Sequence, residues 1–221
     1  MNWTFLQDTS QDWIVLFFIL ILGIFAFVKS YHIFQLNEFL RLLTNNKYVL
    51  IFGKKEKANF IFTFLFLLIQ WWALSIALYL IANIFNVSFE PLDYFVSKQY
   101  IILFCVAFFI ILKLIFQKII IYIFDFSNFS KIYLFIRLSY SNYAGFVLAL
   151  LLFIIIYAFN NQQYIFYLAI LVFLYIQGSG LVTFVKLYKN LIKNYLYYFI
   201  LYICTLEIAP YLFIGYWIMK V

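Results

Sequence analysis

The sequence has few of the residues on which water-soluble folds depend. Charged residues make up only 10% of its 221 positions, against about a quarter in soluble domains. Proline occurs twice, glycine six times and cysteine twice, which excludes a disordered chain, a collagenous fibre and a disulfide scaffold. Hydrophobic residues make up 68% of the chain, more than the interior of a soluble domain can hide. Lipid is the solvent that accepts such a surface, so we expect an integral membrane protein.

Residues that carry chemistry are also scarce. The single histidine, His32, excludes a histidine-based metal site, and we expect no cofactor. Cys105 and Cys204 stand alone in apolar runs, where thiols usually serve as small hydrophobes. Ser179 lies between two glycines and resembles the serine turn of rhomboid proteases, but that motif also needs a histidine in a later span, and the single histidine is His32. We therefore expect close helix packing at these glycines and no enzymatic activity.

Six apolar runs are long enough to be transmembrane helices. About 20 residues are needed to cross about 30 Å of hydrocarbon at about 1.5 Å per residue. The runs cover about residues 13–28, 59–84, 100–124, 143–159, 164–185 and 195–219. We expect that the first run is not a cleavable signal peptide, because Asp8 and Asp12 precede it and no lysine or arginine does. The sequence predicts one all-α integral membrane domain, residues 1–221, with six transmembrane helices.

The basic residues are distributed unequally between the loops. Lys98 and Lys220 are the two of the 15 lysines and arginines that lie toward the opposite side. The other 13, which include Arg137, lie at the end of the third run or in the loops after the first, third and fifth runs. Because cytoplasmic loops hold the excess of basic residues, we expect both termini outside, in the periplasm. The net charge of +7 then reflects topology and attraction to anionic lipid, and we expect no nucleic-acid partner.

The first cytoplasmic loop contains an amphipathic stretch. Residues 31–46 alternate apolar and polar side chains at largely helical spacing, which predicts an interfacial helix in the headgroup region. A docking surface for another protein is the alternative interpretation. Residues 48–57 combine an apolar run with Lys54, Lys55 and Lys57, which is consistent with a small hairpin or a re-entrant segment anchored on anionic lipid.

Polar residues interrupt four of the apolar runs at similar depth. Lys113 in the third run and Glu207 in the sixth each lie roughly 20 Å from the outer end at about 1.5 Å per residue. Gln70 and Gln177 lie at comparable depth, so the four residues are candidates for one intramembrane polar layer. Such a layer has two interpretations: a polar contact that fixes which helices touch, or a proton or ion relay. In a third interpretation, Lys113 is not part of the layer, because its amine extends toward the cytoplasmic side. Pro210, one turn after Glu207, predicts a kink in the sixth helix.

The string LYICTLEIAP at residues 201–210 resembles the C-terminal signature of domain-of-unknown-function family 4271. The members are polytopic bacterial inner-membrane proteins of about this length. The likeness rests on the Leu-Glu-x-x-Pro core formed by Leu206, Glu207 and Pro210, together with size and hydropathy. It implies a location in the inner membrane of a diderm bacterium. It implies no activity, so no catalytic residue can be transferred.

These observations favour a non-enzymatic membrane subunit, or an assembly or anchoring factor, of a larger cell-envelope complex such as secretion, motor or export machinery. The expected partners are membrane lipids and other integral membrane proteins, with a homo-oligomer as a further option. The alternative is a small proton- or ion-coupled transporter that uses Glu207 with Lys113 and Gln177. A lipid-modifying enzyme ranks third, because no cluster of histidine, aspartate or arginine stands at a membrane face.

Overall fold

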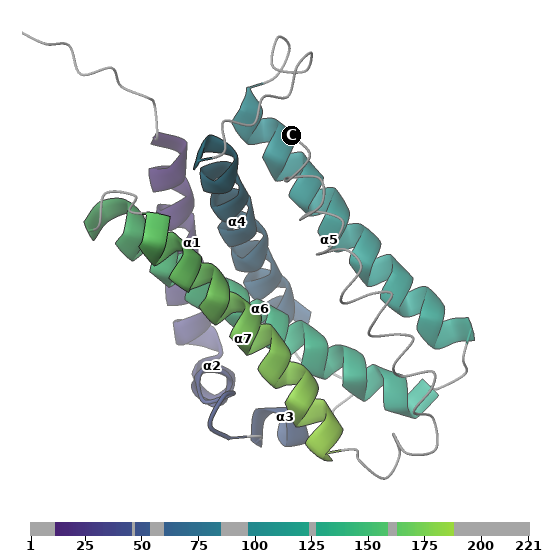
Figure 1. Ribbon diagram of the computed structural model, residues 1–221. Coiled ribbons are helices and arrows are strands. Elements are labelled where there is room, and N and C mark those ends of the chain that lie inside the picture. The colour runs from purple at the N-terminus through teal and green to yellow at the C-terminus, as the bar shows by residue number, and fades with distance from the viewer. Residues whose placement is uncertain are drawn as a thin grey trace, which may run out of the picture.

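A computed structural model describes residues 12–45, 47–53, 60–84, 97–123, 127–158 and 163–187, and these are helical with short turns (Figure 1). The helices in chain order are α1 (Asp12–Tyr31), α2 (Ile33–Leu40), α3 (Lys47–Phe52), α4 (Phe60–Ile84), α5 (Lys98–Ile123), α6 (Ser127–Ala158) and α7 (Gln163–Leu187). No strand occurs within these ranges. The prediction of an all-α protein is confirmed.

Five helices are long and apolar enough to cross a membrane. Their candidate spans are Trp13–Tyr31, Phe60–Ile84, Lys98–Phe116, Ile132–Ala158 and Tyr164–Leu187. A helix satisfies its own backbone hydrogen bonds, which is why such runs fold as helices in lipid. The predicted sixth run, residues 195–219, lies outside the described residues, and Glu207 and Pro210 lie there with it.

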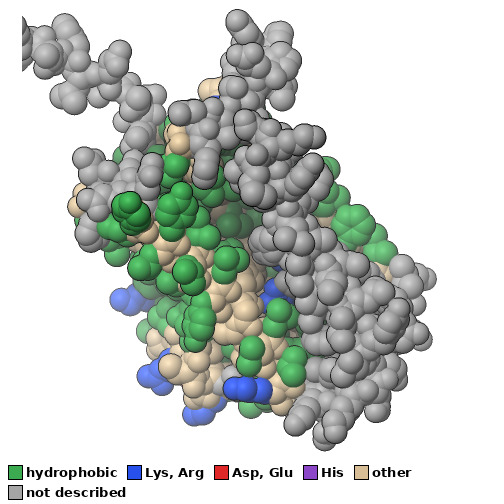
Figure 2. Space-filling view, viewed as in Figure 1, with side chains coloured by type: hydrophobic (Ala, Val, Ile, Leu, Met, Phe, Trp, Pro, Cys, Tyr) green, Lys and Arg blue, Asp and Glu red, His purple; other side chains and the backbone are tan. Residues whose placement is uncertain are grey.

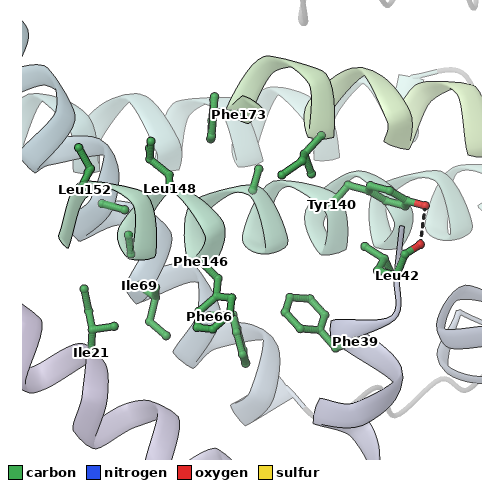
Figure 3. Close-up of a cluster of buried hydrophobic side chains, with 14 of the residues drawn as sticks. Ile21, Phe39, Leu42, Phe66, Ile69, Tyr140, Phe146, Leu148, Leu152 and Phe173 are labelled. Carbon is green, nitrogen blue, oxygen red and sulfur yellow. Dashed lines mark hydrogen bonds between the residues drawn. The ribbon is translucent and has the colours of Figure 1, made fainter. Parts of the chain in front are cut away.

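The core is built around α6, which packs against α4 on one side and α7 on another. Fully buried side chains from these three helices include Phe66 and Ile69 of α4, Leu152 of α6 and Phe184 of α7. Figure 3 shows side chains of α4 and α6 meeting Ile21 of α1 in this core. Helices α4, α6 and α7 also bury polar residues in this core, namely Gln70, Ser141 and Gln177.

Two glycines of the core allow close helix contacts. A methyl group at Gly145 of α6 would lie 2.6 Å from the Cα atom of Gln70, and one at Gly180 of α7 would lie 2.8 Å from the Cγ atom of Tyr140. Gly178, in contrast, is exposed, and no described residue lies within 4 Å of such a methyl group. Close packing therefore holds at Gly180 and is wrong for Gly178.

A short helical segment closes one end of the bundle. Helix α2 buries Leu36 and Phe39 in the core and leaves Ile33 and Phe34 exposed, so apolar side chains lie on both of its faces. Residues 47–52 form helix α3 rather than part of a hairpin. In the view of Figure 2, most of the visible basic side chains gather at the lower end, where Figure 1 places α2 and α3.

Candidate functional site

The polar centre of the bundle is a junction of α4, α6 and α7 at Ser141. The Gln70 side-chain amide donates to Ser141 Oγ at 2.8 Å, and the Gln177 amide donates to the same oxygen at 3.1 Å. All three side chains are buried. The structure thus brings together two of the four residues of the predicted polar layer. Sequence reasoning missed Ser141, because a serine satisfied within a helix bundle gives no distinctive sequence signal.

Arg137 is a charged neighbour of this junction. The sequence places it in a cytoplasmic loop, but it is 4% exposed on α6, one turn before Ser141, and its Nη1 donates to the Gln177 carbonyl at 2.8 Å. The interpretation as a loop residue is wrong because α6 begins at Ser127 and its apolar span at Ile132, well before the fourth predicted run. Serine, asparagine and tyrosine residues lower the mean hydropathy of the first part of α6, although several of their side chains form hydrogen bonds inside the bundle.

The adjacent Asn142 links α6 to α4. Its amide nitrogen donates to the Thr63 carbonyl at 3.1 Å. Asn142 Oδ1 and Gln177 Oε1 are buried acceptors that have no hydrogen-bond partner among the described residues. Rotating the Gln177 amide by 180° would let Ser141 Oγ donate to Oε1 while still accepting from Gln70. The junction therefore has hydrogen-bonding capacity beyond the bonds it makes.

Lys113 occupies the inner face of α5. Ile102 and Val106 are buried against α4, Ile110 packs partly with them, and Lys113 follows at helical spacing as a half-buried residue. The Trp71 indole nitrogen donates to the Leu103 carbonyl at 3.0 Å, which sets the height of α5 against α4.

Lys113 and the Ser141 junction lie at different heights in the bundle. Lys113 is ten residues beyond Leu103, or about 15 Å along the helix. The level of Leu103 is that of Trp71, and Gln70 is the residue next to Trp71 in α4. The structure therefore joins Gln70 with Gln177 and places Lys113 closer to the α5–α6 connection.

Two tyrosines of α6 hold the segment that follows α2. Tyr140 Oη donates to the Leu42 carbonyl at 3.2 Å, as Figure 3 shows, and lies 3.0 Å from Thr183 Oγ1. Tyr143 Oη donates to the Leu40 carbonyl at 3.4 Å. The last carbonyls of a helix lack intrahelical donors, so these hydroxyls satisfy groups that would otherwise be unpaired.

The chemistry available at this polar centre is hydrogen bonding by amides, hydroxyls and the Arg137 guanidinium. No group of three or more histidine, cysteine, aspartate or glutamate residues that could hold a metal occurs in those ranges. Ser179 Oγ donates to the Ile176 carbonyl of its own helix at 2.7 Å. The Ser141 hydroxyl connects helices, whereas the Ser179 hydroxyl bonds within its own helix, and none of the described serines has the geometry of a nucleophile paired with a base.

A family model described as "Domain of unknown function (DUF4271)" matches residues 14–218. The chain belongs to the DUF4271 family. The resemblance at residues 201–210 is therefore confirmed, and the match includes the Ser141 junction as well as the C-terminal signature. No curated protein and no solved structure shows significant similarity to this DUF4271 protein.

Proposed function

We propose that this DUF4271 protein is a six-span protein of the bacterial inner membrane that acts as a non-enzymatic subunit, or an assembly or anchoring factor, of a larger cell-envelope complex. Residues 195–219 supply the sixth span, and both termini face the periplasm. The excess of basic residues after the first, third and fifth runs supports this orientation. On this basis, α2 and α3 lie at the cytoplasmic face and meet anionic lipid.

The outer face of α5 is the observation that carries this proposal. Only 17% of the apolar span of α5 is buried inside the bundle, against 50% for α6. Phe104, Phe108, Ile111 and Ile115 recur at helical spacing along one exposed face. A span attached mainly by one side leaves a continuous apolar face, on which another membrane protein can pack by van der Waals contact.

The use of polar groups inside the bundle supports a non-enzymatic role. Ser141 joins three helices, Arg137 bonds the Gln177 carbonyl, and Asn142 bonds the Thr63 carbonyl. Each of these bonds ties one helix to another, which is the common role of polar side chains between membrane helices. A rigid bundle with free outer faces suits anchoring.

Photo-crosslinking in native membranes tests the α5 surface. A photoreactive phenylalanine analogue replaces Phe108, which is 65% exposed on α5, and in a matched control replaces Leu171, which is 68% exposed on α7. We expect a specific adduct with another integral envelope protein from position 108 and lipid adducts from position 171. Lipid adducts alone at both positions would refute the proposed surface.

The second candidate is a proton- or ion-coupled transporter using Glu207, Lys113 and Gln177. It is favoured by the buried guanidinium of Arg137, which donates to the Gln177 carbonyl, because ionisable groups within a bundle often mark pathways. Glu207→Gln tests it in proteoliposomes. Loss of gradient-driven uptake by a folded variant supports transport, whereas unchanged flux, growth and stability eliminate it.

A further inference from the structure

Helix α2 lies at the edge of the bundle of membrane-spanning helices. The span of α1 ends at Tyr31 and α2 begins at Ile33, so only His32 separates them. Figure 1 shows α2 nearly end-on, whereas the spans are seen from the side, so α2 runs across the bundle. The Phe39 ring lies 5.4 Å from that of Phe62, in the first turn of α4. Helix α2 is therefore at the depth of the lipid headgroups.

The surface of α2 that faces away from the core presents apolar side chains to lipid. Phe34 is exposed, and its ring lies 6.3 Å from that of Phe52 in α3. Leu40 and Leu43 are also exposed. Apolar groups at headgroup depth contact the upper part of the acyl chains. A lipid molecule is therefore the expected neighbour of this surface.

Two side chains of opposite charge lie one turn apart beside these apolar groups. Glu38 is partly exposed on α2, and Arg41 is exposed immediately after the helix ends at Leu40. Residues three apart on a helical turn have Cβ atoms about 5–6 Å apart. Lys47, at the start of α3, is a second exposed cation, and its backbone N–H donates to Asn45 Oδ1 at 3.1 Å. The end of α2 thus presents one carboxylate and two cations to the headgroup region.

The Glu38 carboxylate has an oxygen without a donor. Glu38 Oε2 is buried and has no hydrogen-bond partner in the part of the chain that the structure describes. A buried carboxylate oxygen that lacks a donor costs free energy. Arg41 is at a spacing that permits an ion pair, yet it does not bond this oxygen. An ammonium group would supply both a positive charge and N–H donors, and the Arg41 guanidinium is free to bind a phosphate.

We propose that Glu38 and Arg41 bind the zwitterionic headgroup of an aminophospholipid of the phosphatidylethanolamine class. The ammonium donates to the Glu38 carboxylate, and the phosphate accepts from Arg41, with Lys47 as a second cation. The acyl chains lie on Phe34 and Leu40. This site differs from simple attraction to anionic lipid, because Glu38 repels a headgroup that carries only negative charge. It requires α2 at the membrane edge but not the proposed subunit role, so either proposal can fail alone.

Native mass spectrometry of the purified protein, incubated with equal amounts of three phospholipids, tests the site without any substitution. Phosphatidylethanolamine is expected to be retained about threefold more than phosphatidylcholine, whose methylated amine has the same charge but no N–H donor. It is also expected to be retained more than phosphatidylglycerol, which has a phosphate but no amine. Equal retention of the ethanolamine and choline lipids, or a preference for phosphatidylglycerol, would overturn the proposal.

Substitutions at the two charged residues assign the headgroup contacts. Glu38→Gln is expected to abolish the preference for phosphatidylethanolamine over phosphatidylcholine without weakening the retention of phosphatidylglycerol. Arg41→Gln is expected to reduce the retention of all three lipids, because each carries a phosphate. Lys118→Gln is the matched control, since Lys118 is also exposed and basic but lies on α5, and it should leave all three unchanged.

The thermal midpoint of each variant in the same detergent identifies any variant that does not fold. A folded Glu38→Gln protein that still prefers phosphatidylethanolamine would contradict the proposal. If Glu38→Gln does not fold, the comparison of the three lipids on the wild-type protein decides the matter by itself.

Discussion

Gly145 of α6 lies directly against the backbone of Gln70 in α4, so that an added methyl group would be 2.6 Å from the Gln70 Cα atom. Real carbon atoms do not approach this closely, and backbone atoms cannot turn away as a side-chain tip can. The contact fixes the distance between α4 and α6 beside the Ser141 junction. Small residues at helix interfaces have this role in membrane proteins generally.

Gly145→Ala is therefore expected to destabilise the bundle by about 1–3 kcal/mol through overpacking. Gly178→Ala is the matched control, since it is also within a helix but faces open space, and should be neutral or stabilising by up to about 1 kcal/mol. Thermal unfolding of both variants in the same detergent measures the difference. Equal midpoints would show that α4 and α6 are not in contact at Gly145.

Ser141→Ala should weaken the junction of three helices. It removes the shared acceptor of Gln70 and Gln177, at about 0.6–2 kcal/mol per hydrogen bond. Ser75→Ala serves as the control, because the buried Ser75 hydroxyl bonds the Trp71 carbonyl of its own helix. Unfolding in detergent should show a clear loss for Ser141→Ala and little change for Ser75→Ala. The reverse order would contradict the junction.

Tyr140→Phe is expected to loosen the segment after α2. The variant retains the ring that packs on Gly180 but loses the hydroxyl that bonds the Leu42 carbonyl and contacts Thr183. Hydrogen–deuterium exchange should become faster in residues 41–45. Tyr143→Phe is the comparison variant and should have a smaller effect, because the Tyr143 hydroxyl makes a longer hydrogen bond of 3.4 Å. Unchanged exchange in Tyr140→Phe would mean that its hydroxyl does not hold this segment.

Tyr48, in helix α3, makes the stability of the protein depend on alkaline pH. Burial raises the pKa of its phenol from 10.0 to about 12, although hydrogen bonds with Gln35 and Ser139 act in the opposite direction. Because the folded state favours the neutral phenol, stability is complete below pH 10 and decreases as the pH rises through 12. The loss approaches about 2–3 kcal/mol.

The measurement compares wild type with Tyr48→Phe at several pH values between 9 and 12. The other tyrosines contribute equally to both proteins and cancel in the difference. Wild type should lose stability relative to the variant above pH 10. Parallel curves across this range would show that the Tyr48 phenol is not buried in the folded state.

The apolar runs could be read from the sequence because length and hydropathy determine a membrane helix with little help from tertiary context. Each of the five described spans overlaps one predicted run, although the fourth begins at Ile132 and the run at residue 143. The start of α6 could not be predicted, since Arg137, Ser141 and Asn142 are tolerated there only because neighbouring helices supply partners. Hydropathy along one chain segment does not contain that information.

The polar junction was partly predictable for a similar reason. Gln70 and Gln177 are conspicuous in apolar runs and are close in depth, so the sequence indicates that they meet. Their common partner, Ser141, and the rotation that turns Lys113 to the inner face of α5 depend on how the helices pack. The depth of a residue along a membrane helix follows from counting residues. The rotation of the helix about its own axis follows only from the structure.

The most direct test of the central claim is purification of this DUF4271 protein at its native level into nanodiscs, followed by mass spectrometry and sizing. A subunit or anchoring factor should be recovered in stoichiometric amounts with other integral envelope proteins, in a particle larger than its own 26.7 kDa chain accounts for. Recovery as a lone monomer or homodimer that carries Glu207-dependent transport after reconstitution would contradict that claim.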